Sequence, residues 1–143
     1  MKIRELVVCL FCCLVIGCAG TNSQQGNKKM LVRLTTYSRD EKLPKKHPDK
    51  WSRHGISSTG IPLKNMQSAA VDPKDIAYFS KIQLPCFNHF VLAQDTGSWV
   101  KSRRAALRLG RNCPVIDLFF DRERDAAAFR RRNPLFMEAV IIN

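Results

Sequence analysis

Three aspartates in this sequence follow or interrupt apolar segments, and carboxyl groups in such places can perform acid–base chemistry. Asp72 follows residues 69–71, Asp95 comes soon after residues 91–93, and Asp117 lies inside the run of residues 115–120. Asp is depleted in strands, and burying an unpaired carboxylate costs several kcal/mol or forces the group to take up a proton. Asp117 is therefore the aspartate that a purely structural role explains least.

Carboxylates from separate strand ends would repel one another if they met in one cleft. At least one pKa would then rise, which leaves a carboxylic acid protonated near neutral pH. Cleavage of a glycosidic bond needs such an acid to protonate the leaving oxygen. Structural roles are the alternative, because Asp72 can cap a helical turn before Pro73 and Asp95 can start a turn with Thr96 and Gly97. Spacing alone leaves both interpretations open.

The elements that must position these aspartates are short strands. Strand composition marks six segments in chain order, namely residues 30–38, 68–71, 81–85, 89–94, 115–120 and 137–143. Residues 101–112 have helical composition up to Gly110, residues 122–133 predict an amphipathic helix ended by Pro134, and residues 40–58 predict a long surface loop. Six short strands with few, short helices predict a mainly β protein built as a small barrel.

The N-terminal residues predict export and lipidation. Lys2 and Arg4 precede the apolar segment 7–16, which is too short to span a bilayer and has the length of a signal-peptide core. The sequence VIGC that ends at Cys18 resembles the lipobox of bacterial lipoproteins, which implies cleavage before Cys18 and a lipid on its sulfur. An ordinary secretory signal cut near Ala19 is the alternative.

The expected organisation places the chain in the bacterial cell envelope. Residues 1–17 are predicted to be a lipoprotein signal peptide, 18–29 a flexible polar tether, and 30–143 the folded domain. The formal net charge of +12 favours an anionic partner; the cell wall or the membrane surface is expected there and nucleic acid is not. Ala19 stands where an Asp would favour inner-membrane retention, so the periplasmic face of the outer membrane is predicted. The oligomeric state stays open.

Two of the six cysteines belong to the predicted domain. Cys86 and Cys113 could form a disulfide in an oxidising compartment, but a single pair of cysteines does not establish one. Metal ligation by this pair is not expected, because no CxxC and no nearby His pair accompanies it.

Several segments, in order, resemble one known family. They read LTTYS, SSTGIPL, AAVDPKDIAYFSKIQLP, AQDTGSWVKS and VIDLFF along the chain. This pattern resembles the bacterial 3D domain, named for its three Asp residues. That domain is similar to the catalytic barrel of the membrane-bound lytic transglycosylase A family. The resemblance covers about residues 30–143, nearly the whole predicted domain.

The resemblance implies a fold, a reaction and a set of catalytic residues. The fold is a six-stranded double-psi β-barrel with short helices and a groove across it. The reaction cleaves the MurNAc–GlcNAc β-1,4 bond of peptidoglycan and closes a 1,6-anhydro ring, with a single Asp as both acid and base. Asp117 falls on that acid/base, and Asp95 and Asp72 fall on two supporting acids. The resemblance implies no metal and no cofactor.

The predicted contacts with the glycan strands lie around the same motifs. The expected substrate-binding residues are Tyr37, Thr59, Thr96, Gly97, Trp99 and Lys101. The chain departs from the family after the Asp95 turn, because the second Gly of the turn is missing and residues 102–112 look inserted before Asp117. Trp99 could stack on a sugar face, although a core position is the more frequent fate of Trp in a small domain.

Two other functions compete with catalysis. A double-psi barrel can serve as a non-catalytic cell-wall glycan-binding lipoprotein, and a third possibility is a structural lipoprotein that recruits a wall enzyme. Asp117 discriminates between them, because a solvated Asp117 far from Asp95 would remove the physical basis for catalysis.

Overall fold

The computed structural model describes residues 26–41 and 54–143. The predicted signal peptide, Cys18 and most of the predicted tether and of the 40–58 loop lie outside these residues. The first strand begins at Lys28, two residues before the expected start of the domain. Among the helices in the described ranges, none is both long enough and apolar enough to span a bilayer.

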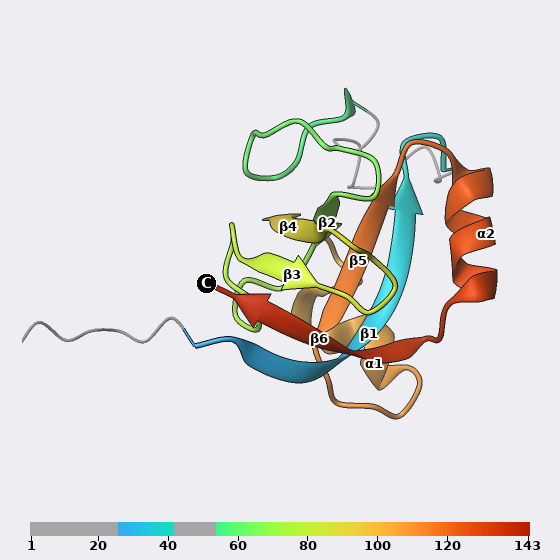
Figure 1. Cartoon of the computed structure of the whole chain (residues 1–143). Coiled ribbons are helices and arrows are strands. Elements are labelled where there is room, and N and C mark those ends of the chain that lie inside the picture. Colours follow the sequence, from blue (N-terminus) through green and yellow to red (C-terminus); the bar gives the residue numbers. More distant parts are fainter. Residues whose placement is uncertain (1–25, 42–53) are drawn as a thin grey trace, which may run out of the picture.

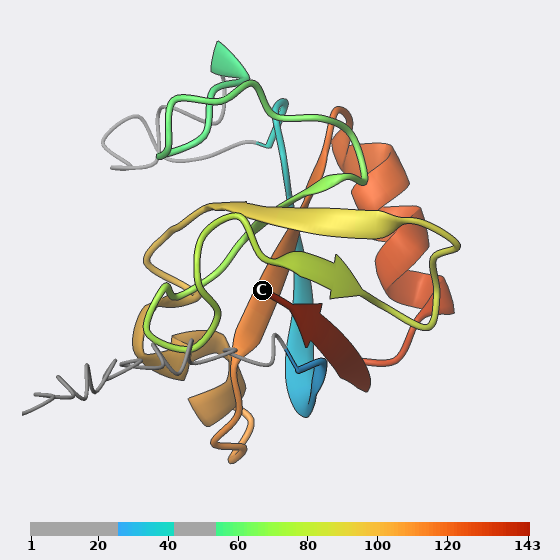
Figure 2. The ribbon, with the colours of Figure 1, turned by 60° about the vertical axis from the view of Figure 1, so that its left-hand side comes forward.

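Six strands pair in a ring and form a closed barrel, in the order β1-β5-β2-β4-β3-β6 (Figures 1 and 2). The strands are β1 (Lys28–Ser38), β2 (Ser68–Ala70), β3 (Lys81–Gln83), β4 (Phe90–Asp95), β5 (Val115–Phe120) and β6 (Phe136–Ile142). The pairs β1·β5 and β2·β4 are parallel, and the other four are antiparallel. The predicted mainly β class with six strands is confirmed. The double-psi arrangement stays a prediction.

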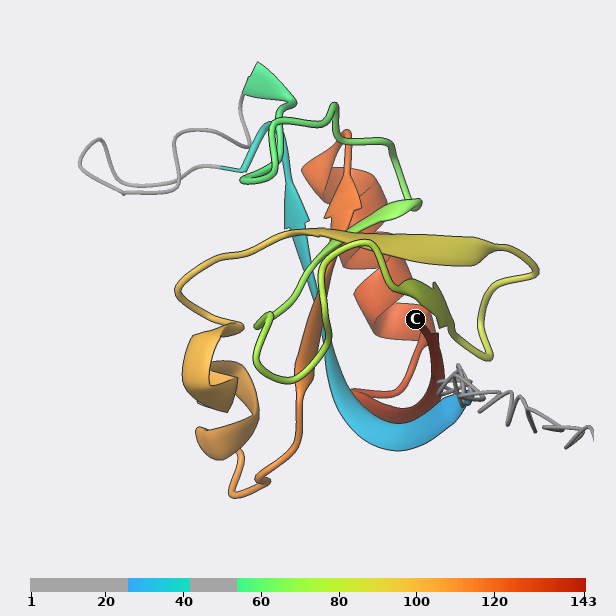
Figure 3. The same cartoon turned by 90° about the vertical axis from the view of Figure 1, so that its left-hand side faces the viewer.

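The two predicted helices have different outcomes. Helix α2 (Glu123–Arg132) forms as expected and packs against β1 and β5, with acidic residues in its first turn and arginines in its last, as the helix dipole favours. The helix expected over residues 101–112 is replaced by the 3-10 turn η2 (Lys101–Arg103) and the single-turn α1 (Arg104–Leu107). Positive φ angles at Ser102 and Arg103 interrupt it. Figure 3 shows this segment outside the ring of strands.

The side chains of a strand point to its two faces in turn, and they belong to two separate clusters of buried residues. In β5, Ile116, Leu118 and Phe120 join the larger core, which α2 also covers. Val115 belongs to a smaller cluster with Val100, Ala106, Cys113 and Ala70, beneath the segment that carries η2 and α1. Because side chains of a strand point to opposite faces in turn, Asp117 lies on the face of Val115, away from the larger core.

The cysteines of the domain lie in different clusters. Cys86 packs against the larger core and Cys113 belongs to the smaller one. Both are free thiols in this structure.

Candidate active site

Asp117 lies at an open pocket between the barrel and the segment that precedes β5. The parallel pairing of β1 and β5 sets Thr35 opposite Asp117, and the Thr35 hydroxyl donates a hydrogen bond of 2.7 Å to Asp117 Oδ1. The second oxygen, Oδ2, is then the one that can carry a transferable proton. The pocket measures about 440 Å³ and is lined by Arg33, Thr35, Thr36, Glu41, Trp99, Ala105, Arg108, Leu109 and Asp117.

The surroundings of Asp117 raise its pKa from 3.8 to about 7. Burial is the largest cause, because it disfavours the charged carboxylate. The hydrogen bond from Thr35 opposes burial, the charges of Glu41 and Asp95 raise the pKa further, and Arg130 lowers it. A carboxyl group in this state holds a proton near neutral pH and can also release it, as a general acid/base requires.

Asp95 lies near Asp117 but is held by other groups. Ala70 of β2 pairs with Asp95 on one side and with Asp117 on the other. Asp95 Oδ2 accepts a hydrogen bond of 2.8 Å from the Tyr37 hydroxyl, and Oδ1 accepts one of 2.8 Å from the backbone N–H of Ser58. Burial and the neighbouring Asp95 raise the pKa of Tyr37, which therefore stays a hydrogen-bond donor. Asp95 acts on Asp117 by its charge.

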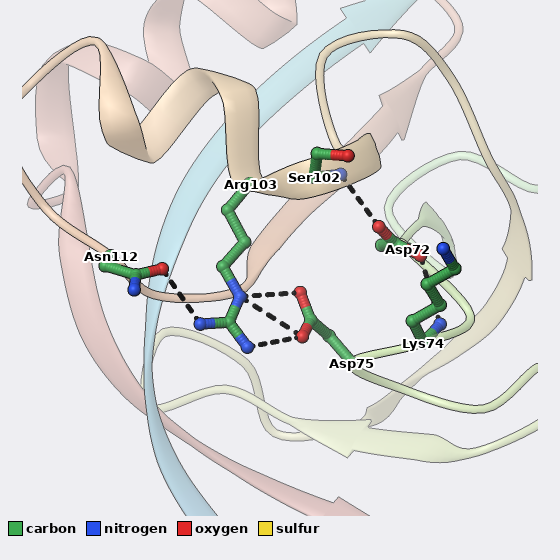
Figure 4. A network of polar contacts seen from close by, with 6 residues as sticks. All are labelled: Asp72, Lys74, Asp75, Ser102, Arg103 and Asn112. Atoms are coloured by element: carbon green, nitrogen blue, oxygen red, sulfur yellow. Dashed lines mark hydrogen bonds and ion pairs between the residues drawn. The ribbon is translucent and has the colours of Figure 1, made fainter.

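The carboxylate of Asp72 accepts hydrogen bonds from two backbone N–H groups (Figure 4). Oδ1 accepts a hydrogen bond of 3.0 Å from the Lys74 N–H, and Oδ2 accepts one of 2.8 Å from the Ser102 N–H. The bond from Ser102 is the main reason that the pKa of Asp72 is lowered. Asp72 thus stabilises a turn of its own, as the capping alternative expected, and also holds η2.

A second acid reinforces this attachment. Arg103 donates to both carboxylate oxygens of Asp75, from Nε to Oδ2 at 3.0 Å and from Nη2 to Oδ1 at 2.6 Å (Figure 4). Its Nη1 donates to Asn112 Oδ1 at 2.9 Å. Ser102 and Arg103 have φ angles of 55° and 57°, which cost L-residues roughly 1–2 kcal/mol each. We call Asp72, Asp75, Ser102, Arg103 and Asn112 the clamp.

Trp99 is the predicted substrate-binding residue that lines the Asp117 pocket. It is 42% exposed, and the guanidinium carbon of Arg108 lies 4.9 Å from the centre of its ring. Trp99 is therefore a wall of the pocket and not a core residue, although the core is the commoner place for Trp.

Four more of the predicted substrate-binding residues lie around Asp95 and the clamp. Thr59 Oγ1 donates to the Gln94 carbonyl at 2.8 Å, and the Gly97 carbonyl accepts the Lys101 N–H at 3.2 Å. Thr96 Oγ1 is buried and has no hydrogen-bond partner within the described residues. The exposed Lys101 acts by its charge on Asp72. None of these four, nor Tyr37, lines the pocket as the described residues define it.

Sequence reasoning missed four pocket residues at and after β1. Arg33, Thr35, Thr36 and Glu41 all line the pocket. The period-2 alternation of a strand places Arg33 and Thr35 on the face of Tyr37, so the expected role of Tyr37 was a signal that could have found them. Glu41 lies beyond the strand, where this alternation does not apply.

Comparison with known proteins finds similarity among solved structures only. No protein-family model matches the chain, and none of the curated proteins does. Among solved structures, a lytic transglycosylase, LtgG, of Burkholderia pseudomallei is 25% identical, with a TM-score of 0.39, and the match covers 61% of this chain and 25% of that one. The chain thus matches about a quarter of the length of that protein, and a TM-score this low does not establish a common fold.

Proposed function

We propose that this protein is a peptidoglycan lytic transglycosylase with a double-psi barrel, and that Asp117 is its single acid/base. The observation that carries the proposal is the state of Asp117, which lies at an open pocket with a pKa of about 7. The pocket volume of about 440 Å³ lies in the usual range for sites that hold a small ligand or a few sugar units. The ordered motifs of the 3D domain, in which Asp117 occupies the acid/base position, favour the same reaction.

The chemistry needs one proton that is given and then taken back. Protonated Asp117 donates to the leaving oxygen of the GlcNAc unit as the bond from C1 of MurNAc to that oxygen breaks. The resulting carboxylate accepts the proton of the MurNAc 6-hydroxyl, whose oxygen bonds to C1 and closes the anhydro ring. Asp117 ends protonated, as it began, so water is not consumed. Asp95 favours the protonated starting state through its charge.

The non-catalytic glycan-binding lipoprotein is the second candidate. The observation that favours it is the exposed Trp99 with Arg108 stacked upon it, because exposed aromatic rings bind sugars with or without catalysis. Wall binding without any cleavage product would assign the protein to this class.

Incubation with peptidoglycan is expected to release 1,6-anhydro fragments, and their yield should fall as the pH rises through about 7. The reason is that the acid must be protonated at the start, and Asp117 loses its proton in that range. Mass spectrometry of the fragments over a series of pH values measures both the product and its decline with rising pH, which we call the pH limb.

The matched control for this limb is Thr35→Val, which keeps the branched shape but removes the hydroxyl. Because the hydrogen bond from Thr35 lowers the pKa of Asp117, its loss should raise that pKa and move the limb to higher pH. A limb that stays in place in Thr35→Val would show that another group controls the rate.

We further propose that a lipid on Cys18 anchors the protein to the periplasmic face of the outer membrane. The lipobox resemblance motivates this proposal, and Cys18 lies outside the described residues. Replacing Cys18 with Ser is expected to release a soluble periplasmic protein. Membrane fractionation measures it, and unchanged association with membranes would contradict the anchor.

A further inference from the structure

The arginines of the described residues differ in their partners, which are carboxylates, aromatic rings or, for Arg39, both. Within the described residues, the salt bridges engage Arg39, Arg103, Arg124 and Arg130. Over the same part of the chain, three other arginines form no salt bridge with a carboxylate and lie over aromatic rings instead. They are Arg33 and Arg111 on Phe136, and Arg108 on Trp99. A guanidinium that an aromatic ring holds in place, with no salt bridge within the described residues, is suited to bind an anionic ligand.

Arg33 lies on β1, the strand that pairs with the Asp117 strand β5. It is two residues before Thr35 on β1, and so on the face that holds Asp117. Its Nη1 donates to the Leu135 carbonyl at 3.0 Å, while its Nε is buried and has no partner among the residues described. Arg33 also lines a second hollow of about 220 Å³ that shares Thr35 and Thr36 with the first. Arg33 therefore borders both hollows.

Arg108 faces the same pocket from the inserted segment. Its guanidinium stacks on the Trp99 ring with 4.9 Å between the guanidinium carbon and the ring centre, and both residues line the pocket. Stacking occupies the face of the guanidinium and leaves its N–H edge for hydrogen bonds, which match the two oxygens of a carboxylate. Glu41 lines the same pocket, and its negative charge would disfavour an anionic group placed beside it.

We propose that Arg33 and Arg108 form a carboxylate-binding subsite of the Asp117 pocket, which selects glycan strands that carry carboxyl groups over neutral ones. Naming glycan strands as the ligand rests on the proposed function. The carboxylate can come from the lactyl ether of the muramic sugar or from the peptide stem attached to it. A neutral polymer of GlcNAc has neither group.

The test measures binding to the Asp117→Asn protein, which should hold saccharides without cleaving them. Isothermal titration compares four probes, namely a neutral GlcNAc tetrasaccharide, a GlcNAc–MurNAc tetrasaccharide with free lactyl carboxylates, the same saccharide with these groups amidated, and one with peptide stems. The free acid is expected to bind roughly tenfold more tightly than the amide and the neutral probe. A preference seen only with the stem-bearing probe would assign the carboxylate to the peptide.

Charge-matched variants then identify the arginines. Arg33→Gln and Arg108→Gln, each in the Asp117→Asn protein, should lose most of the preference for the acid. Arg131→Gln removes the same charge from an exposed position near the end of α2 and should keep the preference. Arg108 is exposed, so its variant is informative even if Arg33→Gln does not fold.

The outcomes separate this proposal from the function on which it rests. Equal affinity for the acid and the amide, with anhydro product still formed by the unmodified protein, would overturn the subsite alone. A preference lost equally in Arg131→Gln would show a general charge effect and would also overturn it. No binding of any saccharide and no product would overturn the subsite together with the proposed function.

Discussion

Asp117→Asn is expected to lower the yield of 1,6-anhydro product by roughly 100- to 10,000-fold, the range that general acid–base groups contribute. Asn keeps the size of the side chain and an oxygen that can accept the 2.7 Å hydrogen bond from Thr35. It cannot donate and recover a proton. Because the size and the hydrogen bond are kept, the variant should fold and still bind peptidoglycan. Mass spectrometry of the fragments measures the lost activity.

The stability of Asp117→Asn should change in the opposite direction. The pKa of Asp117 is about 7 in the folded protein and near 3.8 in the unfolded chain, so between these values the folded state holds a proton that the unfolded state has released. Its contribution to stability is fully present below about pH 4 and is lost as the pH rises to about 7. Asn does not titrate. The melting temperature of Asp117→Asn, relative to that of the unmodified protein, should therefore rise between about pH 4 and about pH 7.

Asp121→Asn is the matched control for both measurements. Asp121 follows β5 and is exposed, and its 3.4 Å ion pair with Arg39 is of the surface kind that contributes little to stability. This variant should keep its activity, and its melting temperature should stay close to that of the unmodified protein at every pH. Full activity in a well-folded Asp117→Asn protein would disprove the catalytic assignment, and a lower melting temperature would point to a structural Asp117.

Asp72→Asn is expected to lower the free energy of unfolding by about 1–3 kcal/mol without moving the pH limb of activity. The carboxylate of Asp72 accepts hydrogen bonds from Lys74 and Ser102 on its two oxygens, and Asn has only one acceptor for them. The lost bond releases η2, whose neighbours Trp99 and Arg108 form the pocket wall. A higher KM for peptidoglycan should therefore accompany the loss of stability. Denaturant unfolding and kinetics at several pH values measure both effects.

A second substitution tests the mechanism of the clamp. Ser102→Gly relieves the positive φ of 55° and should recover about 1 kcal/mol when combined with Asp72→Asn. Asp125→Asn, at an exposed residue in the first turn of α2, is the control for removal of a carboxylate. A pH limb that moved in Asp72→Asn would instead assign Asp72 to the supporting acids that the family resemblance implies.

The sequence by itself determined the strands and the unusual position of Asp117. The six predicted strands all formed. Alternating burial and β-branched composition, which a short segment carries with it, mark β1 and β6, whereas β2 is a fully buried Ser-Ala-Ala segment. The strand expected over residues 81–85 ended at Gln83, ahead of Pro85, which has no N–H to donate to a neighbouring strand. Asp117 could be singled out because a carboxyl group inside an apolar run needs a special environment wherever the strand lies.

Only the tertiary structure decided what surrounds Asp117. Thr35 is 82 residues away in the sequence, and Tyr37 is 58 residues from the Asp95 that it binds; both contacts depend on strand pairing that no local pattern specifies. The helix expected over residues 101–112 formed only as η2 and the single-turn α1, because Asp72 and Asp75, about 30 residues earlier, bind Ser102 and Arg103 in left-handed conformations. Local helix propensity is weak, about 0 to 0.7 kcal/mol per residue, and these long-range hydrogen bonds outweigh it.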